Sequence, residues 1–242
     1  MKFKLLTHID RVNYFSDGFI KYYKNLFDLE EFYFLIHSFN HKKILSYLIS
    51  HGFNKSQTIL YEDVKYSRGN KTNVQYQKQK EFIKQGYTVV YSSQDERIVH
   101  SDLKNYISNK LKDYMVPRGV VIIQHASESK LDVTKPLLSQ RSYQIKNVNG
   151  RSKPQILKNE FKWDNGMHKI PKDAKIDENI YLVDIGKCCA DIALENNIQS
   201  IAMYNNLPNY YDVCNLNTIK KLFFRRNSKD LPEELKRLPN YF

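Results

Sequence analysis

Apolar and polar stretches alternate regularly along the first half of the chain. Short apolar runs are typical of buried strands, and the stretches between them place apolar residues three and four positions apart, as amphipathic helices do. The expected strands are 3–7, 31–38, 56–61 and 87–92, and the expected helices are 14–27, 41–50, 73–84 and 101–111. Strands that alternate repeatedly with helices predict a parallel sheet with helices on both faces.

The pattern is less regular after Pro117. Apolar runs predict further strands at 119–126, 153–161 and 179–186 and a helix at 188–196, while the tail from 208 is aromatic, basic and punctuated by proline. We find no internal repeat and no clear linker. The expected organisation is one α/β domain over 1–206 and a C-terminal extension over 207–242 that packs on it.

Charge narrows the classes of partner. Lys and Arg number 38 against 26 Asp and Glu, a formal net charge of +12. Such a surface attracts nucleic acid, phosphorylated substrates or anionic lipid, and it is equally common on soluble proteins rich in lysine. No ribonucleoprotein-type motif or base-reading basic helix occurs, so no nucleic-acid partner is expected. The one dense basic cluster, 219–229, predicts a helix docked through its aromatics, or alternatively a peripheral membrane contact.

The chain also gives an expectation for its compartment. Charged residues follow the N-terminus too closely for a signal peptide, and no apolar run approaches the ~20 residues of a membrane span. The three cysteines form neither a disulfide framework nor a metal-ligand spacing. We therefore expect a cytoplasmic protein, and the sequence does not predict its oligomeric state.

Candidate chemistry lies where strands end, since ligands of open α/β sheets bind beyond the carboxyl ends of the strands. In the segment VVYSSQDERIVH (89–100), a buried strand leads directly into Asp95 and Glu96. These carboxylates could bind a divalent metal, act in acid–base chemistry, or cap the following helix. Neither a glycine-rich phosphate loop nor a G-x-S-x-G nucleophile elbow occurs, which excludes the common dinucleotide, P-loop and serine-hydrolase sites.

The segment VVYSSQDERIVHSDLKNYI resembles the part of family-2-type glycosyltransferases of the GT-A fold where a strand runs into a D-x-D-E motif. The segments LLSQRSYQI, KPQILK and NGMHKI resemble later landmarks of that group, in the same order, between about 4 and 190. The resemblance implies a GT-A-like (Rossmann-like), mostly parallel sheet flanked by helices. It also implies transfer of a sugar from a nucleotide-sugar donor, UDP-linked in our interpretation, to a glycan or lipid-linked acceptor.

Position in the chain and the resemblance together give candidate site residues. The expected nucleotide-sugar contacts are Thr7, His8, Asp10, Ser38, Ser93, Gln94, Asp95, Glu96, Arg141 and Lys153. The resemblance implies Mn²⁺ or Mg²⁺ held by Asp95 and His168. An inverting transfer needs a carboxylate base near the acceptor hydroxyl. The candidate is Asp164, because of its place in the second half of the chain, and Glu128 is the alternative.

One position departs from the motif. Ser93 stands where the first aspartate of D-x-D is expected. A serine can hydrogen-bond a ribose, but it brings no charge to a metal. Dependence on metal is therefore an open question, and a non-catalytic nucleotide-sugar or carbohydrate-binding protein on the same fold is the alternative function.

Overall fold

A computed structural model describes much of the first 123 residues and shorter segments beyond them. The described residues are 1–12, 14–37, 41–61, 68–123, 143–145, 153–163, 174–187 and 223–225. Every structural statement below concerns these residues.

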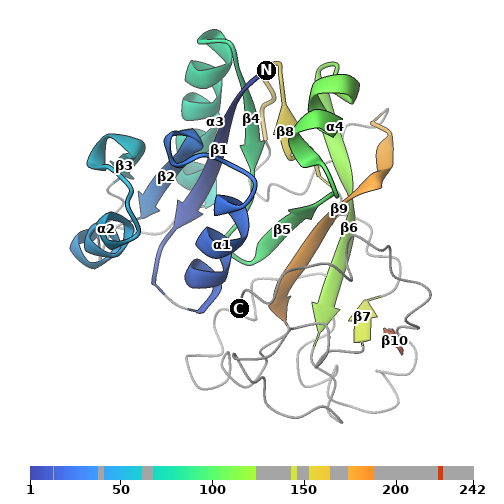
Figure 1. The fold of residues 1–242 in the computed structure, drawn as a ribbon, viewed down its shortest axis with the longest axis horizontal. Helices are drawn as coiled ribbons and strands as arrows, with labels where there is room; N and C mark the ends of the chain where they lie inside the picture. The colour runs from blue at the N-terminus through green and yellow to red at the C-terminus, as the bar shows by residue number, and fades with distance from the viewer. Residues whose placement is uncertain are drawn as a thin grey trace.

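The first half forms a parallel sheet, as its alternating pattern predicts. The strands β1 (Lys2–Ile9), β2 (Phe32–His37), β3 (Thr58–Tyr61) and β4 (Tyr87–Tyr91) lie side by side in the order β3-β2-β1-β4 (Figure 1). They are connected through α1 (Tyr14–Lys24), α2 (His41–Ser50) and α3 (Arg68–Lys84), and short 3-10 turns at Leu29–Glu31 and Lys55–Gln57 precede β2 and β3. This order brings the carboxyl ends of β1 and β4 next to each other.

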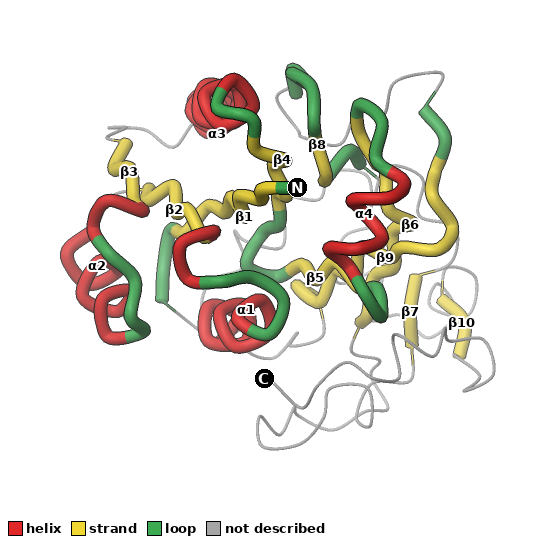
Figure 2. Tube along the Cα trace, turned by 45° about the horizontal axis from the view of Figure 1, so that its top comes forward, coloured by secondary structure: helices red, strands yellow, loops and turns green. Residues whose placement is uncertain are grey.

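The inner strands β1, β2 and β4 are buried on both faces, which explains why they are apolar almost throughout, whereas the edge strand β3 exposes Ile59 and Leu60. Figure 2 shows α1 and α2 on one face and α3 on the other. Alternate residues of β1 enter separate cores: Leu5 and Ile9 pack with α1 and α2, whereas Leu6 packs with Phe82 of α3 and with Trp163. The period of two residues in a strand therefore decides which face each side chain serves.

Later strands add antiparallel pairs, so the whole sheet is mixed. Next to β4 lie β8 (Ile156–Leu157) and β6 (Tyr114–Ile123), followed by β7 (Tyr143–Ile145) and β10 (Phe223–Arg225). Off this path, β9 (Ile176–Lys187) pairs parallel with β6 and antiparallel with β5 (Glu96–Val99). The remaining helix, α4 (Leu103–Lys110), follows β5. The α/β class is confirmed, and its parallel character resides mainly in the first half.

Two helices end at glycines that the sequence marks as stops. Gly52 and Gly86 have φ values of 86° and 82°, in the left-handed region that side chains with a Cβ rarely adopt. The Gly52 amide donates to the Ile49 carbonyl, and the Gly86 amide donates to the Ile83 carbonyl, each at 2.9 Å. These bonds satisfy carbonyls at the helix ends and turn the chain toward the next strand.

Several local predictions need correction; among them, the strand expected at 119–126 is β6, which begins at Tyr114. The helix expected at 101–111 begins at Leu103 with Asp102 as its N-cap, and the strand β5 precedes it. The strand expected over 153–161 is reduced to Ile156–Leu157, and Phe223–Arg225 is a strand rather than part of a helix. α3 starts five residues earlier than the expected 73, at Arg68. Except for that of α3, these corrections depend on pairing with distant strands, which local periodicity does not record. The helix expected at 188–196 lies outside the described residues.

Candidate functional site

A tight turn places Asp95 at the carboxyl edge of the parallel sheet, between β4 and β5. The Ser92 amide still donates to Leu6 of β1 (3.2 Å), and the Glu96 amide closes the turn onto the Ser93 carbonyl (3.0 Å). From β9, the Ile185 amide donates to the Asp95 carbonyl at 2.8 Å. Asp95 is therefore held by its backbone on a rigid frame while its side chain is partly exposed.

A buried ion pair fixes the last residue of this turn. Lys153 Nζ lies 2.6 Å from Glu96 Oε1, and the two side chains are only 5% and 7% exposed. Glu96 Oε2 accepts from Gln155 Nε2 (3.1 Å) and from the Ser93 amide (3.2 Å). Both carboxylate oxygens are therefore engaged, so Glu96 and Lys153 stabilise the turn. Direct contacts of these two residues with a donor remain predictions.

Like charges gather around Asp95. Burial, followed by the negative charges of Asp184 and Glu96, raises the pKa of Asp95 to about 7, although the charge of Lys153 opposes this shift. Asp184 is 4% exposed and lies opposite Glu96 in the β5–β9 pairing, so these two side chains share one face of the ribbon. The site therefore holds Asp95 in a field that favours its neutral form unless a cation is near.

Lys71, a basic residue of α3, interacts electrostatically with Asp95. Burial lowers the pKa of Lys71, while the charges of Asp10, Asp95 and Glu96 raise it and that of Lys153 lowers it. Lys71 stands in the first turn of α3, whereas Asp10 follows β1 and Asp95 follows β4, so acidic residues from two strand ends act on the charge of Lys71. Such an arrangement can bind a group that carries several negative charges and an accompanying cation.

The two predicted residues in β1 lie on opposite faces of the sheet. Thr7 is 1% exposed and its hydroxyl points to the neighbouring His8 carbonyl at 3.4 Å. His8 is 6% exposed, its Nδ1 lies 3.1 Å from the Tyr61 hydroxyl, and its ring meets those of Tyr61 and Tyr91 edge-on. His8 therefore packs between Tyr61 and Tyr91 on the face of the sheet that α3 covers. A role for Thr7 or His8 in donor binding remains a prediction.

Five predicted residues lie outside the described part of the chain and keep the roles predicted for them. They are Ser38, Glu128, Arg141, Asp164 and His168. Among the described residues, no group of three or more His, Cys, Asp or Glu is placed to hold a metal ion. Asp95 and Asp184 would therefore need oxygen ligands from elsewhere to complete a coordination sphere.

Sequence reasoning missed Lys71, Arg97 and Asp184. Arg97 and Asp184 are charged residues inside apolar strands, in ERIV and IYLVDIG, which is itself a signal because burying an unpaired charge is costly. Lys71 gave no such signal, since it is one of several basic residues in a polar helix.

Comparison with known proteins leaves the family open. No protein-family model matches the chain, and no curated protein matches it. Among solved structures, S. aureus TarS 1–349 is 13% identical with a TM-score of 0.31, and the match covers 78% of this chain and 59% of that one. A second structure, of S. aureus TarS, is 12% identical (TM-score 0.32), with 78% of this chain and 36% of that one covered. TarS 1–349 in complex with UDP-GlcNAc is 13% identical (TM-score 0.34), with 100% and 78% covered. The chain thus spans 59% of the first of these structures, and scores of this size carry no argument about function.

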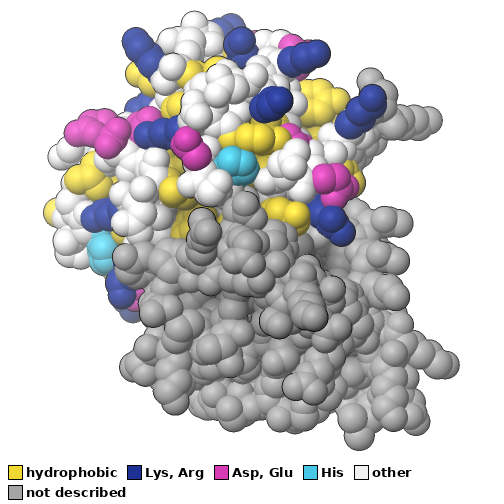
Figure 3. All heavy atoms as spheres, turned by 45° about the vertical axis from the view of Figure 1, so that its right-hand side comes forward, with side chains coloured by type: hydrophobic (Ala, Val, Ile, Leu, Met, Phe, Trp, Pro, Cys, Tyr) yellow, Lys and Arg dark blue, Asp and Glu magenta, His cyan; other side chains and the backbone are white. Residues whose placement is uncertain are grey.

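Two further observations concern surfaces. No described helix is both long and apolar enough to cross a membrane. On the face drawn in Figure 3, the described basic side chains are dispersed among acidic and apolar ones.

Proposed function

We propose that the protein is a glycosyltransferase that moves a sugar from a UDP-linked donor to a glycan or lipid-linked acceptor. The observation that carries the proposal is that Asp10, after β1, and Asp95, at the carboxyl end of β4, both act on the charge of Lys71. This is the edge at which α/β sheets bind ligands. It is also where the resemblance to glycosyltransferases places the donor.

The chemistry of the transfer explains the mixture of charges. When the sugar leaves, negative charge grows on the nucleoside diphosphate, and fixed positive groups lower the energy of that state. Lys71 would meet the diphosphate, while the Glu96–Lys153 pair keeps the turn rigid. Ser93, partly exposed on the turn, offers a hydroxyl to the ribose.

Oxygen atoms near the turn support a role for Mn²⁺ or Mg²⁺ in the proposed site. Asp95 and Asp184 provide hard oxygen ligands, and the Gln155 Oε1 atom beside Glu96 is buried without a hydrogen-bond partner. When bound, the ion would act as a Lewis acid that stabilises the leaving diphosphate. The predicted ligand His168, the predicted diphosphate contact Arg141 and the candidate bases Asp164 and Glu128 would complete the proposed site.

Calorimetry with UDP and a panel of UDP-sugars, with and without Mn²⁺, tests the proposal, followed by an assay for donor hydrolysis and transfer. Asp95→Ala should abolish Mn²⁺-dependent binding. Asp28→Ala is the matched control and should bind normally. It removes an aspartate whose side chain is 82% exposed and which precedes β2, at the opposite edge of the sheet. Unchanged binding by Asp95→Ala would show that the site is assigned wrongly.

The second candidate is a nucleotide-sugar or carbohydrate-binding protein without catalysis. Ser93 favours it, because the turn has one acid fewer than the motif and Glu96 is tied to Lys153. A ligand at 100 times its dissociation constant should stabilise the fold by roughly 2.7 kcal/mol in either case. Slow hydrolysis of any donor would exclude the binder, whereas binding without turnover on all donors and acceptors would favour it. The membrane contact through 219–229 remains a prediction.

A further inference from the structure

The guanidinium group of Arg97, two residues after Asp95, is almost completely buried. Arg97 is 1% exposed and is the largest fully buried side chain of the described residues. Its Nη1 donates to the carbonyls of Gln94 (2.7 Å) and Glu96 (2.8 Å), which flank Asp95 on both sides. A buried charge is stable only where its donors are paired. The conformation of the turn around Asp95 therefore depends on the position of the Arg97 side chain.

The same turn is attached to the start of α1. Gln94 Nε2 donates to Ser16 Oγ at 2.8 Å and lies 3.4 Å from the Arg11 carbonyl, and Ser16 Oγ itself donates to that carbonyl at 3.1 Å. Arg97 Nη2 reaches the Phe15 carbonyl at 3.5 Å. The residues on either side of Asp95 thus both contact the segment that follows Asp10.

We propose that Gln94 and Arg97 form a latch that positions Asp95 relative to the loop after β1. Gln94, the middle residue of the motif, then acts through its contact with Ser16 and not by touching the donor. The latch deepens the proposed function and rests on it, because Asp95 is there the residue that meets the cation and the diphosphate. A planar guanidinium can span two carbonyls at once, which a lysine ammonium at the end of a flexible stem does less well.

The latch is tested with Gln94→Leu and Arg97→Lys in the full chain. Hydrogen-exchange mass spectrometry should show that each variant loses protection in two peptides at once, one that contains Ser16 and one that contains Asp95. Titration with Mn²⁺ should show about 10–100-fold weaker binding, the usual effect of removing a group that orients a metal ligand. If Arg97→Lys fails to fold, Gln94→Leu alone decides.

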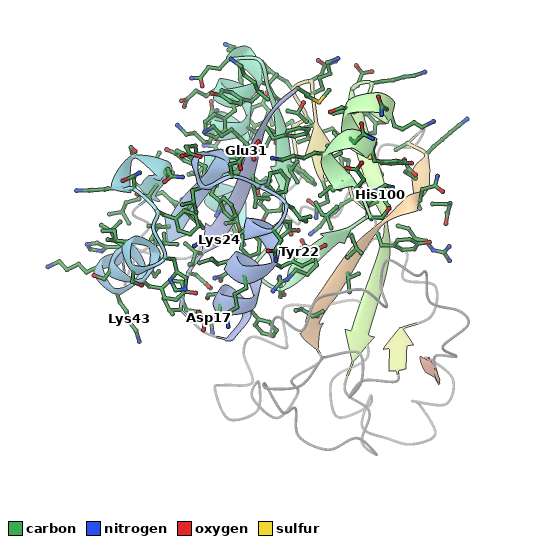
Figure 4. The ribbon with its side chains drawn as sticks, viewed as in Figure 1. Asp17, Tyr22, Lys24, Glu31, Lys43 and His100 are labelled. Carbon is green, nitrogen blue, oxygen red and sulfur yellow. The ribbon has the colours of Figure 1, made fainter. Side chains whose placement is uncertain are left out.

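Tyr22→Phe is the control, since Tyr22 projects from α1 toward β5 (Figure 4) and its hydroxyl donates to the Ile98 carbonyl at 2.8 Å. The ring of Tyr22, whose centre lies 5.9 Å from the Arg97 guanidinium carbon, is kept in this variant. Tyr22→Phe should lower thermal stability and leave Mn²⁺ affinity unchanged. Equal weakening of Mn²⁺ binding in Tyr22→Phe and Gln94→Leu would overturn the latch. So would lost protection in only one peptide. If the wild type binds neither Mn²⁺ nor UDP, the proposed function fails, while hydrogen exchange still decides the latch.

Discussion

Removing Lys153 should destabilise the protein far more than an average lysine substitution. Its Nζ lies 2.6 Å from Glu96 Oε1, with both side chains 5–7% exposed. Lys153→Met leaves the Glu96 carboxylate buried without its ammonium partner. Breaking a buried pair from one side costs about 3–5 kcal/mol, because the remaining charge keeps its desolvation penalty and loses its partner.

The double variant Lys153→Met/Glu96→Gln separates this cause from lost packing. It removes the uncompensated charge, so it should recover about 2–4 kcal/mol of the loss. The cost of the single variant should also shrink toward pH 4, where a glutamate can take up a proton with little cost. In the folded Lys153→Met variant, burial without a partner favours the protonated form of Glu96. Protonated Glu96 therefore favours folding of this variant at low pH, and that contribution is lost as pH rises and the carboxyl ionises.

Urea unfolding at pH 8 and pH 4 measures these differences. The single tryptophan of the chain, Trp163, is 4% exposed, so its fluorescence reports the loss of the core on the α3 side of the sheet. Lys80→Met is the matched control, because the side chains of the Lys80–Glu160 pair are 35% and 38% exposed, and solvent screens such a pair so that its loss should cost little. A similar cost for Lys153→Met and Lys80→Met, or no recovery in the double variant, would refute the reasoning.

Three other substitutions test neighbouring features. Burial raises the pKa of Asp95 to about 7, so its carboxyl favours folding below about pH 4 and loses this effect as pH rises through 7. Asp95→Asn should therefore raise the free energy of unfolding by about 2–4 kcal/mol at pH 8 and by little at pH 4, and equal effects in urea unfolding at both values would contradict this. Tyr23→Phe removes a hydroxyl that donates to Ser92 Oγ and accepts from the Ile98 amide, both at 2.8 Å. It should lower the free energy of unfolding by about 1–3 kcal/mol. The control Tyr87→Phe changes a partly exposed residue and should lower it by less than half as much. Gly86→Ala should lower the free energy of unfolding by about 1–2 kcal/mol, because the φ of 82° strains a residue with a Cβ. The added Cβ meets open space, so a steric clash does not contribute. An unchanged melting temperature would exclude backbone strain at this position.

The local pattern of the sequence determined the first half of the fold. Apolar runs and helical spacing predicted β1, β2, β4 and α2 closely, since hydrophobic periodicity depends only on which face of an element is buried. The parallel sheet then follows from alternation, and its carboxyl edge follows from the direction of the strands. For this reason the place of Asp95, directly after β4, could be predicted without coordinates.

What surrounds Asp95 was decided by tertiary structure alone. The pairing of β5 with β9 brings Asp184 beside the turn across 88 residues of sequence from Glu96, and Lys153 reaches Glu96 over a separation of 57 residues. Such contacts depend on the register between distant strands, which no local window of sequence contains. The sequence determined that two adjacent acids stand at the mouth of a strand. Tertiary packing decided that Glu96 is held in an ion pair, while Asp95 stays partly exposed and interacts electrostatically with Asp184 and Lys71.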